Sequence, residues 1–353
     1  MLIARLLLVL PLLTLACGDG GTSAEPDAGN LREIRQPLMV GEDGRSDELR
    51  FSVPSGTRSM TVVVQGGLAS LYGLAELRLA GGGDLVGLPA GHPGPAMRSL
   101  YDEEQIGHMP GDLDQSTRLG TFTLVYPYRP DQELSAGEIS LRVAGEAAGP
   151  VDVTVLLPED DSSAALHVEL VVVSDTIELA EPPVFLDDVQ EILGQAGLGV
   201  VFDGTRTLTG TDLEAITDFS EPQETPTSMS AMLPALVADG ASSALPVFIV
   251  EALPPGVGGL SLGTPGPPLR DSYFHGVVLR HFADPAEMAR VMAHEVCHFL
   301  ALQHVTNRGI SGAIYDDPLD DTRPGEGNLM EDGTILTADQ SFALRRSALL
   351  QPN

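Results

Sequence analysis

The most informative stretch of this chain reads His294-Glu295-Val296-Cys297-His298-Phe299-Leu300-Ala301-Leu302-Gln303-His304. The whole chain has only 8 histidines, yet His294, His298 and His304 all fall in this window. On a helix, His294 and His298 lie on one face, where two imidazoles can bind one metal ion. Catalytic zinc needs three protein ligands and an open fourth position, and His304 can supply the third ligand. The pattern therefore predicts a Zn²⁺ site.

The residues before this stretch predict where its helix begins. Asp284 is a suitable N-cap, and Pro285 suits the first helical position. Glu287 stands three residues after the cap, as a capping box requires. We therefore expect a helix that starts at residue 285 and carries both His294 and His298.

Strand and helix patterns alternate upstream of this helix, so residues 164–353 are predicted to form one α+β domain. A polar, turn-rich segment at 158–163 marks its beginning. The segments expected within it are the strands Leu166–Val173, Val200–Asp203, Pro246–Glu251 and Gly276–Arg280 and the helix Pro183–Gln195.

Residues 31–158 show a different pattern, with short β-type runs separated by Gly, Pro and Asp. Alternation of apolar and polar residues without a helical period predicts an antiparallel β-sandwich domain, interrupted by an irregular insertion from Gly81 to Ser116. The expected strands are Leu49–Val53, Met60–Gln65, Leu74–Leu79, Gly120–Tyr126, Glu138–Ala144 and Val151–Leu157.

The first residues form a targeting segment. Arg5 precedes a short apolar run, Leu6 to Leu15, and small residues surround Cys17. This resembles a bacterial lipoprotein signal, which implies that residues 1–16 are removed and that Cys17 is acylated. Residues 17–30 then form a flexible tether, and the protein is anchored by lipid to a bacterial membrane, at the outer membrane or cell surface. An ordinary secretory signal with an incidental cysteine is the alternative, and it also predicts export.

Composition limits the possible partners. The formal net charge is -31, from 19 Lys and Arg against 50 Asp and Glu. Such a charge repels nucleic acid and anionic lipid headgroups, so we expect neither as a partner, and a lipid would be the only membrane contact. Cys297 has no cysteine to pair with once Cys17 is acylated, and it is expected to be a small buried side chain.

Residues 294–304 resemble the HExxHxxGxxH signature of the metzincin zinc peptidases. Ala301 replaces the glycine of that signature, and an alanine at positive φ costs about 1 kcal/mol. Downstream, Met330 resembles the methionine of the metzincin Met-turn, although Asp332 stands where a tyrosine would assist catalysis. The segments 317–322 and 336–340 are similar to the pappalysin-like group of this family.

The resemblance implies a zinc-dependent endopeptidase with Glu295 as the general base. Zinc-activated water would attack a peptide bond of a protein or peptide substrate, and the substrate would lie along an edge strand of the sheet. Pro246–Glu251 or its neighbour is the predicted edge strand. Structural Ca²⁺ at the acidic run Asp316, Asp317, Asp320 and Asp321 is compatible with the family, as is a solvated acidic loop.

Two other classes of function remain open. A catalytically inactive metzincin-like fold could serve as a binding or adhesion lipoprotein, because Ala301 and Asp332 depart from the family pattern. Alternatively, the β-sandwich is the functional domain and mediates adhesion or glycan binding, with the second domain as a scaffold. An intact Glu295 argues against the first alternative, and an aromatic content of only 5% argues against the second.

Overall fold

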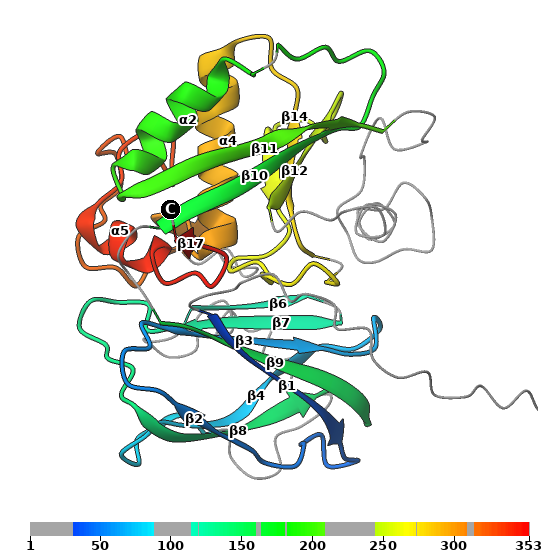
Figure 1. Ribbon diagram of the computed structural model, residues 1–353, viewed down its shortest axis with the longest axis vertical. Helices are drawn as coiled ribbons and strands as arrows, with labels where there is room; N and C mark the ends of the chain where they lie inside the picture. Colours follow the sequence, from blue (N-terminus) through cyan, green and yellow to red (C-terminus); the bar gives the residue numbers. More distant parts are fainter. Residues whose placement is uncertain are drawn as a thin grey trace, which may run out of the picture.

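The computed structural model describes residues 31–87, 114–118, 120–159, 164–180, 182–208, 244–272, 274–308 and 314–352. Within these residues the chain is α+β, with strands in both halves and helices in the C-terminal half alone. In Figure 1 the N-terminal half, coloured blue to green, lies below the C-terminal half, coloured green to red. The predicted signal peptide (1–16), the tether (17–30) and Cys17 lie outside the described residues.

Two antiparallel sheets make up the N-terminal half (Figure 1). The five-stranded sheet has the order β1 (Leu31–Val40), β9 (Gly149–Pro158), β3 (Met60–Gln65), β7 (Thr121–Tyr126) and β6 (Asp114–Arg118). The four-stranded sheet has the order β2 (Leu49–Val53), β8 (Gly137–Gly145), β4 (Tyr72–Arg78) and β5 (Asp84–Gly87).

The two sheets share one hydrophobic core. Along β2, Leu49, Phe51 and Val53 are buried while Arg50 and Ser52 are exposed. This alternation is expected for a strand with one face on a core and one face in water. Side chains from β3, β7 and β9 of the other sheet belong to the same buried cluster.

The apolar pattern of the sequence finds the central strands and misses some edge strands. β2 and β3 have the predicted bounds. The prediction of an irregular insertion from Gly81 to Ser116 is wrong in two places, because β5 and the start of β6 are strands within it. The sequence of β6 is DQSTR, and it pairs only with β7. Such an edge strand needs no apolar alternation, so its sequence carries no strand signal. Residues 88–113 lie outside the described residues.

The C-terminal half contains one main sheet, in which β10 lies between β11 and β12. Its path is β11 (Leu198–Thr207), β10 (Ala164–Val172), β12 (Leu245–Val250), β14 (Val277–Arg280) and β13 (Gly259–Ser261). Neighbouring strands are parallel except β13, which runs antiparallel to β14 at the edge. The remaining strands are β17 (Gln351–Pro352), which pairs with the start of β10, and the separate hairpin of β15 (Thr306–Arg308) and β16 (Ile314–Asp316).

Helices α2 (Phe185–Gly194), α4 (Pro285–Leu300) and α5 (Ala338–Leu344) pack against one face of this sheet (Figure 1). Along β10, Leu166, Val168 and Leu170 join the cluster that contains the helices. Val171, and Val173 just after the strand, join a cluster on the opposite face. Because both faces are covered by apolar side chains, the strands read as nearly continuous hydrophobic runs.

The cap of α4 differs in detail from the prediction. Asp284 is the N-cap and Pro285 follows it, as expected. The Asp284 carboxylate accepts a hydrogen bond from the amide of Ala286 at 3.0 Å. Ala286 is the second helical residue, whereas a capping box with Glu287 requires a bond to the third, so the predicted capping box is wrong. α5 has such a box, between Thr337 and Gln340.

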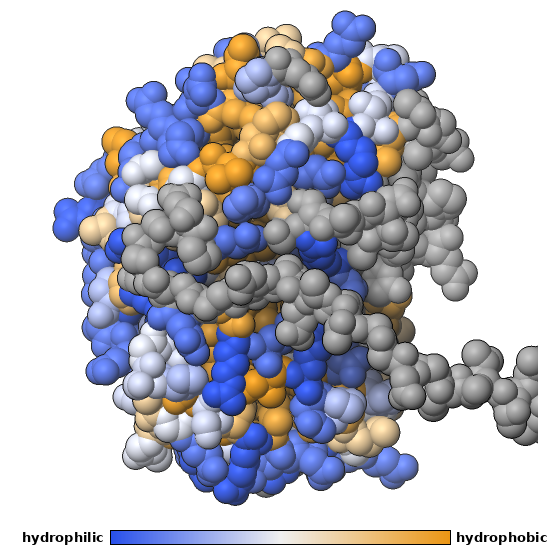
Figure 2. Space-filling model, viewed as in Figure 1, coloured by the Kyte–Doolittle hydropathy of each residue, from blue (hydrophilic) through white to orange (hydrophobic). Residues whose placement is uncertain are grey.

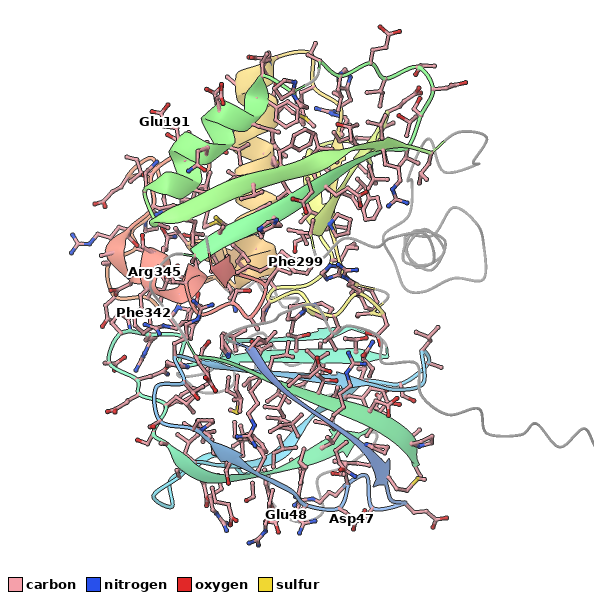
Figure 3. The ribbon with its side chains drawn as sticks, in the orientation of Figure 1. Asp47, Glu48, Glu191, Phe299, Phe342 and Arg345 are labelled. Carbon is pink, nitrogen blue, oxygen red and sulfur yellow. The ribbon has the colours of Figure 1, made fainter. Side chains whose placement is uncertain are left out.

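The two halves contact each other directly. The Arg58 guanidinium donates to the Ser347 carbonyl at 3.1 Å, and the Ser59 hydroxyl donates to the Arg346 carbonyl at 2.7 Å. Tyr128, from the N-terminal half, is completely buried within the core of the C-terminal half. In Figure 3, Arg345 lies on the side of the C-terminal half that faces the N-terminal sheets. The N-terminal half therefore completes the core of its neighbour.

The surface agrees with the high charge of the chain. On the face drawn in Figure 2, hydrophilic side chains form most of the outline, and apolar side chains are visible between them. Among the helices of the described residues, none combines the length and the hydropathy that a membrane-spanning helix requires.

Candidate metal centre

The structure brings His294, His298 and His304 together. The Nε2 atom of His304 lies 3.2 Å from Nε2 of His294 and 3.1 Å from Nε2 of His298. Within the described residues, these three form the one group of His, Cys, Asp or Glu side chains close enough to hold a metal ion. His298 is buried, His294 is half-buried and His304 is exposed. The cluster is therefore open to solvent on the side of His304.

Hydrogen bonds to backbone carbonyls determine which nitrogens can bind a metal. Nδ1 of His294 lies 2.6 Å from the Leu329 carbonyl oxygen, and Nδ1 of His298 lies 2.6 Å from the Leu302 carbonyl oxygen. A carbonyl oxygen only accepts hydrogen bonds, so both Nδ1 atoms carry a proton. In a neutral imidazole the Nε2 atom then presents a lone pair. Burial supports the neutral form, since it lowers the pKa of His294 to about 4.

Two of the separations between these nitrogens match those around a tetrahedral zinc ion. Nitrogens that bind zinc at 2.0–2.1 Å in tetrahedral geometry lie about 3.3 Å from one another. The distances from His304 to His294 and His298, 3.2 and 3.1 Å, are close to this value. The Nε2 atoms of His294 and His298 both face Nε2 of His304. A bound cation satisfies all three nitrogens.

Ala301 turns the chain so that His304 reaches the helical histidines. It has a φ of 131° and is the one non-glycine residue with positive φ in the described part of the chain. Its amide donates to the carbonyls of Cys297 and His298, and the amide of Leu302 donates to Cys297 at 2.8 Å. The backbone therefore adopts at an alanine the conformation expected for the glycine of the signature, with the strain that a Cβ adds there.

Glu295 lies on the same helix and is almost fully buried. Its Oε2 atom accepts a hydrogen bond from the amide of Ser261 at 2.8 Å. Burial raises the pKa of Glu295 to about 7, and the bond from Ser261 opposes this rise. A carboxyl group with a pKa near neutrality suits a general base or acid.

The edge strand beside Glu295 is β13, which contains Gly259 and Ser261. The sequence predicts Pro246–Glu251 or its neighbour as this edge strand. That prediction is wrong, because β12 lies in the interior between β10 and β14. A Cβ added to Gly259 would lie 2.5 Å from Cγ of Glu295. Only glycine permits so close an approach of the strand to this side chain.

Met330 lies in a loop that supports the cluster. It is completely buried in the core that contains α4, and the preceding residue, Leu329, supplies the carbonyl that accepts from His294. The amide of Leu329 donates to the Ile335 carbonyl at 2.8 Å, which closes the loop on itself. The sequence indicated Met330, while the role of the Leu329 carbonyl has no side-chain signature.

The acidic run next to the cluster contains two carboxylate oxygens with no hydrogen-bond partner, Oδ2 of Asp317 and Oδ1 of Asp321. Burial raises the pKa of Asp317 to about 6. The described acidic residues do not form a group as close as the histidines. Calcium binding at this run stays a prediction. Cys297 is completely buried, and burial raises the pKa of its thiol, so it is an inert core residue.

Comparisons with known proteins find structural neighbours only. No family model matches the sequence, and no curated relative is found. Archaemetzincin from Methanopyrus kandleri is 14% identical, with a TM-score of 0.29 over 52% of this chain and 88% of its own. Metalloproteinase-II from Bacteroides fragilis is 10% identical, also with a TM-score of 0.29, over 52% of this chain and 63% of its own.

Proposed function

We propose that this protein is a zinc-dependent endopeptidase of the metzincin type. The observation that carries the proposal is the convergence of three histidine Nε2 atoms, two of them oriented by bonds to carbonyls. His294 and His298 lie on the helix that also carries Glu295, and His304 follows its end. His294, His298 and His304 are the proposed ligands. The separations of His304 Nε2 from the other two nitrogens, 3.2 and 3.1 Å, match tetrahedral geometry and favour zinc.

The proposed reaction is the hydrolysis of a peptide bond by water. Bound at the three histidines, zinc supplies Lewis-acid chemistry, making water more acidic and stabilising negative charge. Glu295 takes a proton from the attacking water and delivers it to the leaving amine, which its pKa of about 7 permits near neutral pH. The amide of Ser261 holds one oxygen of Glu295, which leaves the other oxygen for the proton transfer.

A protein or peptide substrate would bind in extended form along β13. Among the described strands, β13 lies at one of the two edges of the sheet, and it packs against the active-site helix. An extended peptide can add to such an edge through main-chain hydrogen bonds. We propose no nucleic acid partner, because the net charge of -31 opposes one.

The proposal includes export and a lipid anchor at Cys17, on the basis of the apolar run and small residues around that cysteine. The proposed zinc site would then lie outside the cytoplasm, in a domain that the tether holds near a bacterial membrane. The N-terminal half is proposed to be a β-sandwich accessory domain, and its contribution of Tyr128 to the neighbouring core supports a structural role.

Zinc analysis tests the metal site. The purified protein should hold close to one zinc ion per chain, and His304→Ala should lower the affinity sharply, because the site loses one of three ligands. His281→Ala is the matched control, since His281 lies in the same half but outside the cluster. Equal zinc affinity in His304→Ala and the parent would refute the proposed ligand set.

Peptide cleavage tests the role of Glu295. Glu295→Gln keeps the side-chain size and changes no proposed ligand, so zinc content should persist while cleavage falls by about 10²–10⁴-fold. Glu287→Gln, on an exposed position of the same helix, should cleave like the parent. Equal cleavage by Glu295→Gln at matched zinc content would refute the mechanism.

The competing proposal is a zinc-binding lipoprotein without catalysis, acting in binding or adhesion. Two observations motivate it: Ala301 carries backbone strain at the turn to His304, and Asp332 stands in place of the tyrosine. A parent protein that binds zinc but cleaves nothing in a diverse peptide and protein library would favour this function over the endopeptidase.

A further inference from the structure

Two buried amide side chains, Asn328 and Gln340, bind each other close to the histidine cluster. Asn328 Nδ2 donates to Gln340 Oε1 at 2.9 Å, and Gln340 Nε2 donates to Asn328 Oδ1 at 3.0 Å. Asn328 is 3% exposed and Gln340 is 0% exposed. Two buried polar groups are tolerated at this depth because each satisfies the other.

Each amide oxygen also accepts a backbone hydrogen bond. Asn328 Oδ1 accepts from the amide of Met330 at 2.8 Å, and Gln340 Oε1 accepts from the amide of Thr337 at 3.0 Å. Gln340 belongs to the capping box of α5, whose residues Ala343 and Leu344 are buried in the core. The amide pair therefore connects the loop at Met330 to a helix that is fixed by core packing.

One peptide group links this pair to the proposed metal ligand. The carbonyl of Leu329 and the amide of Met330 belong to the same peptide unit, which is planar. Its N–H end donates to Asn328 Oδ1, and its C=O end accepts from His294 Nδ1 at 2.6 Å. Holding the N–H end fixes the peptide plane and hence the direction of the carbonyl.

We propose that Asn328 and Gln340 are positioning residues for His294, acting through the Leu329–Met330 peptide group. This inference rests on the proposed zinc site. The carbonyl orients the imidazole ring and keeps its proton on Nδ1, so Nε2 points at the other two histidines with its lone pair free. Loss of the amide pair releases the peptide plane and lets the ring turn away.

The alternative is that the pair only stabilises the fold. A purely structural role would lower the free energy of unfolding and leave the zinc affinity of the folded protein unchanged. A positioning role lowers the zinc affinity even in variants that remain folded. Zinc affinity, measured separately from stability, therefore distinguishes the two.

The test measures the zinc Kd of the metal-free full chain by competition with a chromogenic chelator, with circular dichroism to verify folding. Asn328→Leu/Gln340→Met removes both amides and keeps apolar volume, which limits the loss of stability. We expect a zinc Kd about 10–100-fold weaker than that of the parent, the range for lost partners of a metal ligand. Asn328→Asp keeps an oxygen for the Met330 amide and should stay closer to the parent.

Ser46→Ala is the control for destabilisation alone. Ser46 is buried in the N-terminal half, where its hydroxyl accepts from the Val143 amide at 2.9 Å. This variant should unfold more easily and bind zinc like the parent. If the double variant does not fold, Gln340→Met replaces it, with a weaker Kd than that of Ser46→Ala as the expected result.

Two outcomes overturn different statements. A parent-like zinc Kd in the folded double variant, or in Gln340→Met where that variant is used, overturns the positioning role of the amide pair. A parent protein that binds no zinc overturns the proposed zinc site itself, before any variant is compared.

Discussion

Gly259→Ala tests whether the close approach of β13 holds Glu295 in place. The added Cβ would lie 2.5 Å from Cγ of Glu295 and 3.0 Å from side-chain atoms of both Leu279 and Val291. Carbon atoms in contact prefer about 3.5–4.0 Å, so Cγ of Glu295 must move by roughly 1 Å. Overpacking of this kind costs about 1–3 kcal/mol of stability. A displacement of about 1 Å at a reacting group can cost about 10²-fold in rate.

The assay compares kcat for peptide cleavage at matched zinc content in the parent, Gly259→Ala and Gly258→Ala. Gly258 is the control, because the three atoms nearest to its added Cβ belong to Phe282, at 3.1 Å, and Val291, at 3.6 Å. We expect kcat to fall about 10²-fold in Gly259→Ala and to stay near the parent value in Gly258→Ala. A folded Gly259→Ala enzyme with parental kcat would refute the argument that glycine is required beside Glu295.

Three further predictions concern other parts of the chain. In urea unfolding, Ala301→Gly should stabilise the metal-free protein by less than about 1 kcal/mol, because the strain relieved at a φ of 131° exceeds the cost of the added entropy of the unfolded chain. A less stable variant would contradict this. Cys17→Ser should move the protein from the membrane fraction to the soluble extract without loss of fold, and a processed variant still in the membrane would indicate another anchor. Burial raises the folded-state pKa of Asp317 from 3.8 to about 6. Between these two pH values the folded state therefore binds more protons than the unfolded state, and the free energy of unfolding should decrease as the pH rises from 3.8 to about 6. The difference corresponds to at most about 3 kcal/mol. Urea unfolding of the Asp317→Asn variant in EDTA should show no such decrease in stability with pH. A pH profile equal to that of the parent would refute the role of Asp317.

The sequence determined the local features of the site. His294 and His298 share a helix face because of the helical period alone, and Asp284 with Pro285 is sufficient to locate the start of α4. The strand β2 was predictable for the same reason, since its apolar alternation records a single buried face. Each of these features depends on residues a few positions apart, so local physics specifies them.

Only the tertiary structure decided what holds the proposed catalytic residues. The partner of Glu295 is the Ser261 amide, 34 residues away, and the partner of His294 is the Leu329 carbonyl, 35 residues away. These partners are backbone atoms, which every residue possesses, so no sequence pattern marks them. The edge strand was misassigned for a related reason: β12 and β13 are both short, and their order in the sheet depends on pairing between distant segments, which no local periodicity encodes.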